Sequence, residues 1–283
     1  MNGVILVSTV LIFNTLIFAP DNDLAYISFL PTYAAVAYYH NQLPQKPADL
    51  KAFLKEVRGF AGGTYRDALF AGGIVSVEKK KEVLAKLHQY TGLSEAYWDK
   101  ANLRVSEPQF TQELMRQDGK TTGRLDARYS GVTQNLLSEF SDFDPQSSAI
   151  SPPYTALFMH YYFSELKAPE DLDYHVSAYS AKGFKWDWKR GGGSNYPSGV
   201  NTAADLQDAM TKNPQLKVLV MNGYYDLATP FYGAEYTFDH MNLPENIRKN
   251  VSMTYYEAGH MMYIHKESLP QFKTDLAQFI QAH

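Results

Sequence analysis

Two segments decide the fold, Leu219-Val220-Met221-Asn222-Gly223-Tyr224-Tyr225-Asp226 and Tyr256-Glu257-Ala258-Gly259-His260-Met261. Each runs from strand-like residues into a glycine-containing turn, and each turn carries one acid–base side chain, Asp226 in the first and His260 in the second. Ligands of open α/β sheets bind outside the carboxyl ends of the strands. The two segments therefore predict a parallel sheet with an acid and a histidine at that edge.

The residues around these turns alternate between strand and helix signals. Strands are expected at 216–221 and 251–256, and helices at 231–241 and 268–282. The last helix opens with Ser268-Leu269-Pro270-Gln271, which has the form of a capping box. Such alternation is typical of a doubly wound, mostly parallel sheet, so the predicted fold class is α/β.

The N-terminus carries an apolar run at 4–13 that 16–19 extends. A signal peptide is disfavoured because no Lys or Arg precedes the run and no small-x-small cleavage site follows it. Stable membrane insertion is also disfavoured, since Asn14-Thr15 interrupts the run before the roughly 20 residues that a bilayer requires. A surface anchor formed by 4–19 would lack flanking charge. The prediction is a buried parallel strand beginning at Val4.

Between Pro31 and Pro214 the sequence is helical in character, which predicts a helical cap at 31–214 inserted into a core made of 1–30 and 215–283. Apolar spacing predicts one helix after Pro47, with that proline in its first turn, and another at 75–90 that Gly92 ends. Capping boxes are expected to start two more helices. They are Ser106-Glu107-Pro108-Gln109 and Thr202-Ala203-Ala204-Asp205.

Two further features of the cap concern its second half. Pro152-Pro153 precedes an aromatic-rich stretch at 154–166, which predicts a long and partly buried helix. The glycine-rich stretch at 191–199 is predicted to be flexible and to return the chain from cap to core.

Composition limits the classes of function. With 283 residues, 45% of them hydrophobic and 20% charged, the chain can bury one substantial core. The net charge is −4 and both signs are interspersed, so nucleic acid is not an expected partner. The absence of cysteine excludes disulfides and thiolate metal sites. His260 and His265 do not share a helical face, so no metal site is expected from them.

An acid followed by a histidine on strand-end loops is the order of the last two members of a Ser, Asp, His triad in α/β-hydrolases. The serine of such a triad stands in a G-x-S-x-G elbow, and no such motif occurs in the sequence. Taken singly, each residue has a simpler explanation. Asp226 could form an Asx turn after its strand, and His260 could be a structural histidine in a turn.

Five segments together resemble a bacterial-type member of the serine carboxypeptidase family, which belongs to the α/β-hydrolase clan. They are residues 2–8, Gly123-Arg124-Leu125-Asp126-Ala127-Arg128-Tyr129, Trp186-Asp187-Trp188, Asn222-Gly223-Tyr224-Tyr225-Asp226 and Gly259-His260-Met261. The similarity covers essentially the whole chain and maps it onto the C-terminal portion of the family, without the N-terminal strands. It implies that Asp226 is the triad acid, His260 the triad base, and Met261 part of the pocket for the leaving residue.

The resemblance implies hydrolysis of the C-terminal bond of a peptide substrate through a serine acyl-enzyme, with no metal or organic cofactor. The cap would shape the pocket, and aromatics at 154–163 are candidate walls, although core packing is the favoured role for most of them. A periplasmic or extracellular location is implied for the full-length protein. Because the serine elbow and the oxyanion-hole segments have no counterpart, the chain alone is expected to be inactive.

A second hypothesis makes the chain a non-catalytic binding subunit or a pseudoenzyme fragment of α/β-hydrolase ancestry. Missing strands would leave an unpaired sheet edge that a separate N-terminal half, or a second copy of the chain, could cover.

Overall fold

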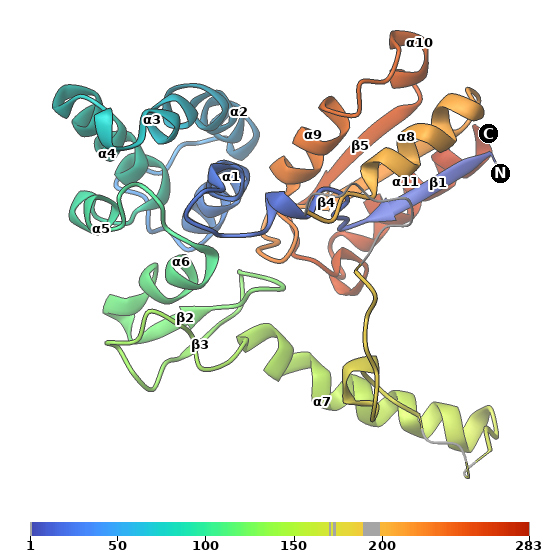
Figure 1. Ribbon diagram of the computed structural model, residues 1–283. Coiled ribbons are helices and arrows are strands. Elements are labelled where there is room, and N and C mark those ends of the chain that lie inside the picture. The colour runs from blue at the N-terminus through green and yellow to red at the C-terminus, as the bar shows by residue number, and fades with distance from the viewer. Residues whose placement is uncertain (1, 170, 172–173, 189–198, 283) are drawn as a thin grey trace.

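The computed structural model describes residues 2–169, 171, 174–188 and 199–282. The protein is mixed α/β. Its main sheet has three parallel strands in the order β1 (Gly3–Val7), β4 (Lys217–Gly223) and β5 (Val251–Tyr256). In Figure 1 this sheet lies on the same side of the molecule as both termini, and helices α1 to α6 form a separate group. The three strands predicted from the sequence are confirmed.

The two faces of the sheet are covered by different helices. Along β4, Val218 and Val220 face one way and pack with α8 (Ala203–Lys212), α9 (Phe231–Asp239) and α10 (Glu245–Arg248). Leu219 and Met221 face the other way and pack with Tyr256 and α11 (Leu269–Gln281). A near-continuous apolar strand is the expected sequence for a position covered on both faces.

Strand β1 differs from its prediction in burial. It pairs with β4 from Gly3↔Lys217 to Val7↔Met221, but its residues from Val4 to Val7 are only partly buried. The reason is its position, since β1 is an edge strand in the described sheet. The prediction of a strand was right and the prediction of full burial was wrong.

Two of the predicted capping boxes are not formed. The hydroxyl of Thr202 lies against the carbonyl oxygen of Leu11, at 3.4 Å, and does not cap α8. The hydroxyl of Ser268 pairs with Nδ1 of His265 at 2.7 Å and does not cap α11. In both cases a partner outside the helix competes for the hydroxyl, distant in the sequence for Thr202 and three residues away for Ser268.

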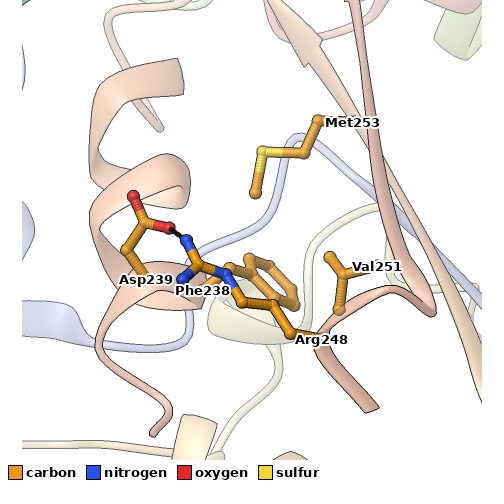
Figure 2. A pocket seen from close by; sticks show the side chains of 5 residues that line it. All are labelled: Phe238, Asp239, Arg248, Val251 and Met253. Carbon is orange, nitrogen blue, oxygen red and sulfur yellow. Dashed lines mark hydrogen bonds and ion pairs between the residues drawn. The ribbon is translucent and has the colours of Figure 1, made fainter. Parts of the chain in front are cut away.

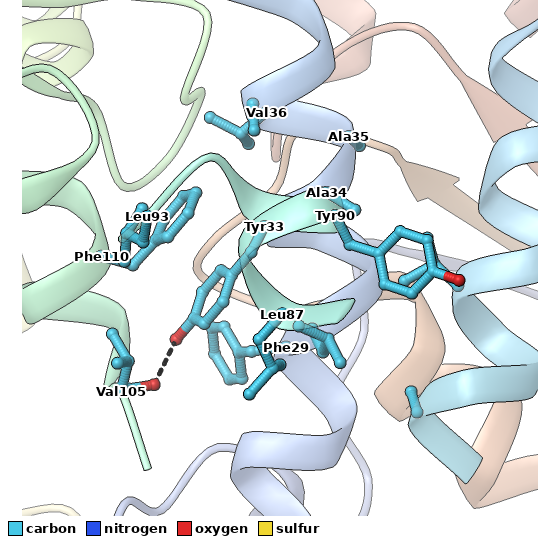
Figure 3. Packing of buried hydrophobic residues seen from close by; sticks show 14 of the residues in the cluster. Phe29, Tyr33, Ala34, Ala35, Val36, Leu87, Tyr90, Leu93, Val105 and Phe110 are labelled. Atoms are coloured by element: carbon cyan, nitrogen blue, oxygen red, sulfur yellow. Dashed lines mark hydrogen bonds between the residues drawn. The ribbon is translucent and has the colours of Figure 1, made fainter. Parts of the chain in front are cut away.

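The helical part is built around α1 (Asp23–Tyr39), which starts before the predicted cap boundary at residue 31 and runs through it. Nearly every residue from Ala25 to Ala37 is buried, and a helix that is apolar on all sides belongs in the middle of a core. Figure 3 shows Tyr33 of α1 among Phe29, Leu87 and Phe110. The Tyr33 ring stacks on Phe110 with centroids 4.1 Å apart.

Five more helices of the described residues belong to this part. They are α2 (Leu50–Phe60), α3 (Arg66–Ala71), α4 (Val77–Thr91), α5 (Glu95–Lys100) and α6 (Glu107–Glu113). Of these, α2, α4 and α6 lie where the sequence signals predict helices, whereas α3 and α5 were not predicted. Gly92 ends α4 with a left-handed φ of 75°, as predicted. The capping box at Ser106 and Gln109 is confirmed. Pro47 is not in the first turn of α2, because Asp49 caps that helix through the N–H of Ala52.

Short turns complete the element list. Those with 3₁₀ geometry are Phe13–Thr15, Gly72–Ile74, Arg116–Asp118, Ala178–Ser180 and Met262–Ile264, and those with π geometry are Ala61–Tyr65 and Tyr161–Glu165. Among the described residues, no helix combines the length and the apolar character needed to cross a membrane.

The second half of the predicted cap departs most from expectation. Strands β2 (Lys120–Thr122) and β3 (Ser130–Val132) form an antiparallel pair where only helices were expected. Helix α7 (Pro145–His160) starts well before the predicted helix, because Asp144 caps it through the N–H groups of Gln146 and Ser147. Residues 191–198 of the predicted flexible stretch lie outside the described residues.

The aromatic helix is less buried than predicted. No residue of 154–166 is fully buried, and those that are partly buried are Thr155, Met159, Tyr162 and Phe163. Tyr154, Leu157, Phe158 and Tyr161 are exposed, so core packing is not their role. Figure 1 shows α7 extending along the bottom of the view, away from the three-stranded sheet. Helix α7 contains one proline pair, Pro152-Pro153, and its aromatics lie on several sides, so it has no single apolar stripe to pack on a core.

Candidate functional site

Asp226 and His260 meet at the carboxyl edge of the sheet. Asp226 follows β4, which ends at Gly223, and His260 follows β5, which ends at Tyr256. Oδ2 of Asp226 lies 2.9 Å from Nδ1 of His260. The structure thus brings together the two residues that the sequence singled out.

The Asp226 carboxylate is completely buried and fully hydrogen-bonded. Its Oδ1 accepts hydrogen bonds from the backbone N–H groups of Ala228 and Thr229, at 2.8 and 2.9 Å. Its Oδ2 accepts one from the hydroxyl of Thr229, at 2.7 Å, beside the imidazole. One oxygen therefore forms the Asx turn and the other holds the histidine, so the two interpretations of Asp226 are compatible.

The surroundings of His260 adjust its basicity. Burial lowers the pKa of the imidazole, but the hydrogen bond and the negative charge of Asp226 outweigh it, and the net pKa is raised. The charge of Arg124 opposes the rise. The side chain is 30% exposed, and Nε2 has no hydrogen-bond partner among the described residues. This nitrogen is placed to exchange a proton with a group outside the pair.

Backbone hydrogen bonds fix the main chain around His260 to two other segments. We call residues 256–260 the histidine turn. The carbonyl oxygens of Tyr256 and Ala258 accept hydrogen bonds from the backbone N–H groups of Tyr224 and Tyr225, at 2.9 and 3.0 Å. The N–H of His260 donates to the carbonyl of Leu125 at 2.6 Å. These hydrogen bonds connect the turn to residues 224–230, the loop that carries Asp226 and that we call the acid loop, and to Leu125, which is distant in the sequence.

Ser8, at the end of β1, also contacts the histidine turn. It has a left-handed φ of 48°, which is uncommon for a residue other than glycine and marks local backbone strain. Its hydroxyl donates to the carbonyl oxygen of His260 at 2.6 Å. Because this hydroxyl donates to the main chain and not to the ring, Ser8 supports the turn.

Glycines allow the two loops to approach one another. A Cβ on Gly223 would overlap the carbonyl oxygen of Gly259 and lie 2.5 Å from that of Ala258. A Cβ on Gly259 would lie 2.5 Å from the Cα of Asp126. Since neither neighbour is the end of a flexible side chain, both positions require glycine.

Several residues of this site were not singled out from the sequence. Thr229 belongs to no quoted segment, and Ser8 and the segment from Gly123 to Tyr129 enter only as parts of a resemblance. The contact between Gly259 and Asp126 joins positions 133 residues apart, a separation at which periodicity gives no signal. The local clue that was present is the acid and the arginine at 126 and 128, two positions apart.

Met261 lies directly beside His260 and is half-buried. Its role in a leaving-residue pocket stays a prediction. A pocket does occur elsewhere, and Figure 2 shows its lining residues. They are Phe238, Asp239, Arg248, Val251 and Met253. Because Val251 begins β5 whereas His260 follows its end, this pocket lies at the opposite end of the strand and is not part of the candidate site.

Within the ranges that the structure describes, no three His, Asp or Glu side chains are grouped so that they could hold a metal ion. His265 instead pairs with Glu267 at 2.8 Å and lies 2.9 Å from Arg128.

Glu107 is a second buried acid near the site, and we expect it to make stability depend on pH. Burial raises its pKa to about 7, against the opposing charge of Arg124. The folded state then keeps this proton at pH values where the unfolded chain, with a value near 4.5, has lost it. The free energy of unfolding should fall as pH rises from 4.5 through 7 and level off above.

Glu107→Gln tests this expectation. At pH 8 the variant should be more stable than the parent by up to about 3 kcal/mol, and at pH 4 the two should be similar. Urea unfolding at both pH values measures the difference. The matched control is Glu95→Gln, at an exposed position in the first turn of α5. Equal stability gains at pH 4 and pH 8 would contradict the assignment.

The chain was compared with family models, curated proteins and solved structures. No family model matches it, and neither the curated proteins nor the solved structures contain a match.

Proposed function

We propose that this chain supplies the acid and the base of a serine-type carboxypeptidase, as the C-terminal part of an α/β-hydrolase fold. The observation that carries the proposal is the buried Asp226 carboxylate, 2.9 Å from Nδ1 of His260, with Nε2 of the same ring left open. Both residues follow the carboxyl ends of adjacent parallel strands. A Ser, Asp, His triad requires the acid and the histidine at strand ends, the acid first in the chain, and the carboxylate bonded to Nδ1 so that Nε2 faces the serine.

The chemistry assigned to the pair is proton transfer. Nε2 of His260 takes the proton of the serine hydroxyl as that oxygen attacks the carbonyl carbon of the C-terminal peptide bond. The same nitrogen then gives the proton to the leaving amine, and a second round with water releases the acyl group. Asp226 keeps the proton on Nδ1 and stabilises the imidazolium that forms. The substrate is a peptide with a free C-terminus, and the steps use no cofactor.

The serine comes from outside this sequence, since no G-x-S-x-G occurs in it. The open side of β1 is where further strands of an α/β-hydrolase sheet would pair, because β1 has only β4 as a neighbour in the described sheet. An exported location follows from the same proposal. The chain by itself is expected to release no amino acid from a peptide.

The test is an assay of the product of the whole reading frame that contains this chain. We expect it to release the C-terminal residue from N-acyl dipeptides, and to react with a fluorophosphonate probe at a serine. Substrates with an amidated C-terminus should be poor, which separates a carboxypeptidase from a general esterase or endopeptidase. Fluorophosphonate labelling without release of a terminal residue would contradict the carboxypeptidase assignment but keep the hydrolase one.

A second candidate is a non-catalytic binding subunit, favoured by the half-buried edge strand β1 and by the exposed aromatic side chains of α7. Such a chain should be found in a stable complex or should bind a hydrophobic dye when isolated. A monodisperse monomer that binds no dye would count against it.

A further inference from the structure

Residues 124–128, which we call the bridging segment, lie between the two loops of the candidate site. The carbonyl of Arg124 accepts a hydrogen bond from the N–H of Leu227, and the N–H of Ala127 donates to the carbonyl of Tyr225, both at 3.0 Å. The carbonyl of Leu125 accepts the N–H of His260. One segment thus contacts the main chain on both sides of the Asp226–His260 pair.

Within the bridging segment, Asp126 and Arg128 form a buried ion pair. Nε and Nη2 of Arg128 donate to the two carboxylate oxygens of Asp126, at 3.0 and 2.6 Å. The side chains are only 9% and 12% exposed. A two-point contact between planar groups fixes orientation as well as distance.

This ion pair also holds the histidine turn from two directions. Oδ2 of Asp126 accepts the N–H of Gly259 at 3.2 Å, and Nη1 of Arg128 donates to the carbonyl of Glu257 at 2.8 Å. Gly259 has no side chain to restrict its own φ and ψ, and its neighbour is His260. The direction of the imidazole therefore depends on groups outside the turn.

We infer that Asp126 and Arg128 are positioning residues that fix the main chain of residues 257–259 and so keep the His260 imidazole on Asp226. The inference rests on the proposed function only in naming His260 as the base. Neither side chain contacts the imidazole itself in the described structure, so both act through the turn. The alternative role is general stabilisation of the fold. A positioning role predicts that a substitution loosens the histidine turn alone, whereas general stabilisation predicts that it loosens the whole sheet.

The experiment is residue-resolved hydrogen exchange on the isolated chain carrying Asp126→Asn. We expect the amides of Gly259 and His260 to exchange at least about tenfold faster, while those of Val218 and Val220 in the centre of the sheet keep their rates. The titration midpoint of the His260 ring, followed by NMR, should fall, because the imidazole spends less time on Asp226. Neither readout requires activity, so failure of the proposed function would leave both unaffected.

Two further variants complete the design. Asp67→Asn is the matched control, since Asp67 forms an ion pair with Arg66 on the surface, with both side chains more than half exposed, and should change neither readout. Arg128→Lys keeps the positive charge but not the two-point contact, and should loosen the same two amides. A uniform rise in exchange across the sheet, an unchanged His260 titration, or unfolding of both site variants would overturn the inference in favour of general stabilisation.

Discussion

Replacing His260 with alanine in the product of the whole reading frame is expected to lower kcat by about six powers of ten, while the protein stays folded. The size of the loss follows from the role proposed for Nε2, which takes and returns a proton in each half of the reaction. Folding should persist because the ring is partly exposed and makes no contact that the core depends on. Steady-state release of the terminal residue measures kcat, and thermal unfolding checks the fold.

Asp226→Asn should lower kcat by about four powers of ten, and it does so by a different route. An amide at this position can donate to Nδ1 and so stabilise the wrong tautomer, which leaves Nε2 without a free electron pair. The control is His240→Ala, an exposed histidine that stacks on Tyr236, and its turnover should match the parent. Unchanged turnover in His260→Ala would remove the basis of the triad assignment.

Gly223→Val is expected to have the largest effect on stability, a loss of more than about 4 kcal/mol. Any side chain at this point meets the carbonyl oxygens of Ala258 and Gly259, and both belong to a turn that is hydrogen-bonded on each side. Main-chain atoms held in this way cannot move aside independently. The change should therefore either separate β4 from the histidine turn or prevent folding.

Urea unfolding of the variant and of a glycine control gives the comparison. Gly59 lies inside α2, and a Cβ there would meet no atom within 4 Å. Gly59→Ala should raise stability by up to about 1 kcal/mol, because alanine favours the helix. If Gly223→Val retained the stability of the parent, the close approach of the two loops would not exist in solution.

The sequence predicted best those features that depend on contacts between residues close together in the chain. The near-continuous run of apolar residues along 216–221 and the turn at Gly223 predict a covered strand with Asp226 beyond its end, and that is what the structure contains. Gly92 and Ser106 mark helix boundaries through contacts within one turn, so they too were predictable. The histidine partner of Asp226 followed from strand ends that meet at one edge.

What the sequence could not supply depends on contacts between distant residues. Thr202 begins a capping-box pattern, but its hydroxyl lies against the carbonyl oxygen of Leu11, which only the tertiary structure brings near. Ser268 differs, because its partner His265 is three residues away and the turn at 265–268 makes the contact. The ion pair of Asp126 and Arg128 has an effect on Gly259 because three chain segments converge there. The exposure of α7 was missed because aromatic content suggests burial, whereas burial requires a surface to pack on.

The packing around α1 has a consequence for how the molecule loses its structure. The hydrophobic cluster of the helical part includes Tyr224, Tyr225, Leu227 and Phe231, which belong to the acid loop and to the helix after it. Melting of α1 would expose these side chains, so the helices and the acid loop should unfold cooperatively in one transition. Helix α7 contributes nothing to that cluster, and fraying of its C-terminal turns would leave the Asp226–His260 pair intact. Its N-cap residue Asp144 does contact the bridging segment, since it accepts hydrogen bonds from the N–H groups of Arg124 and Leu125.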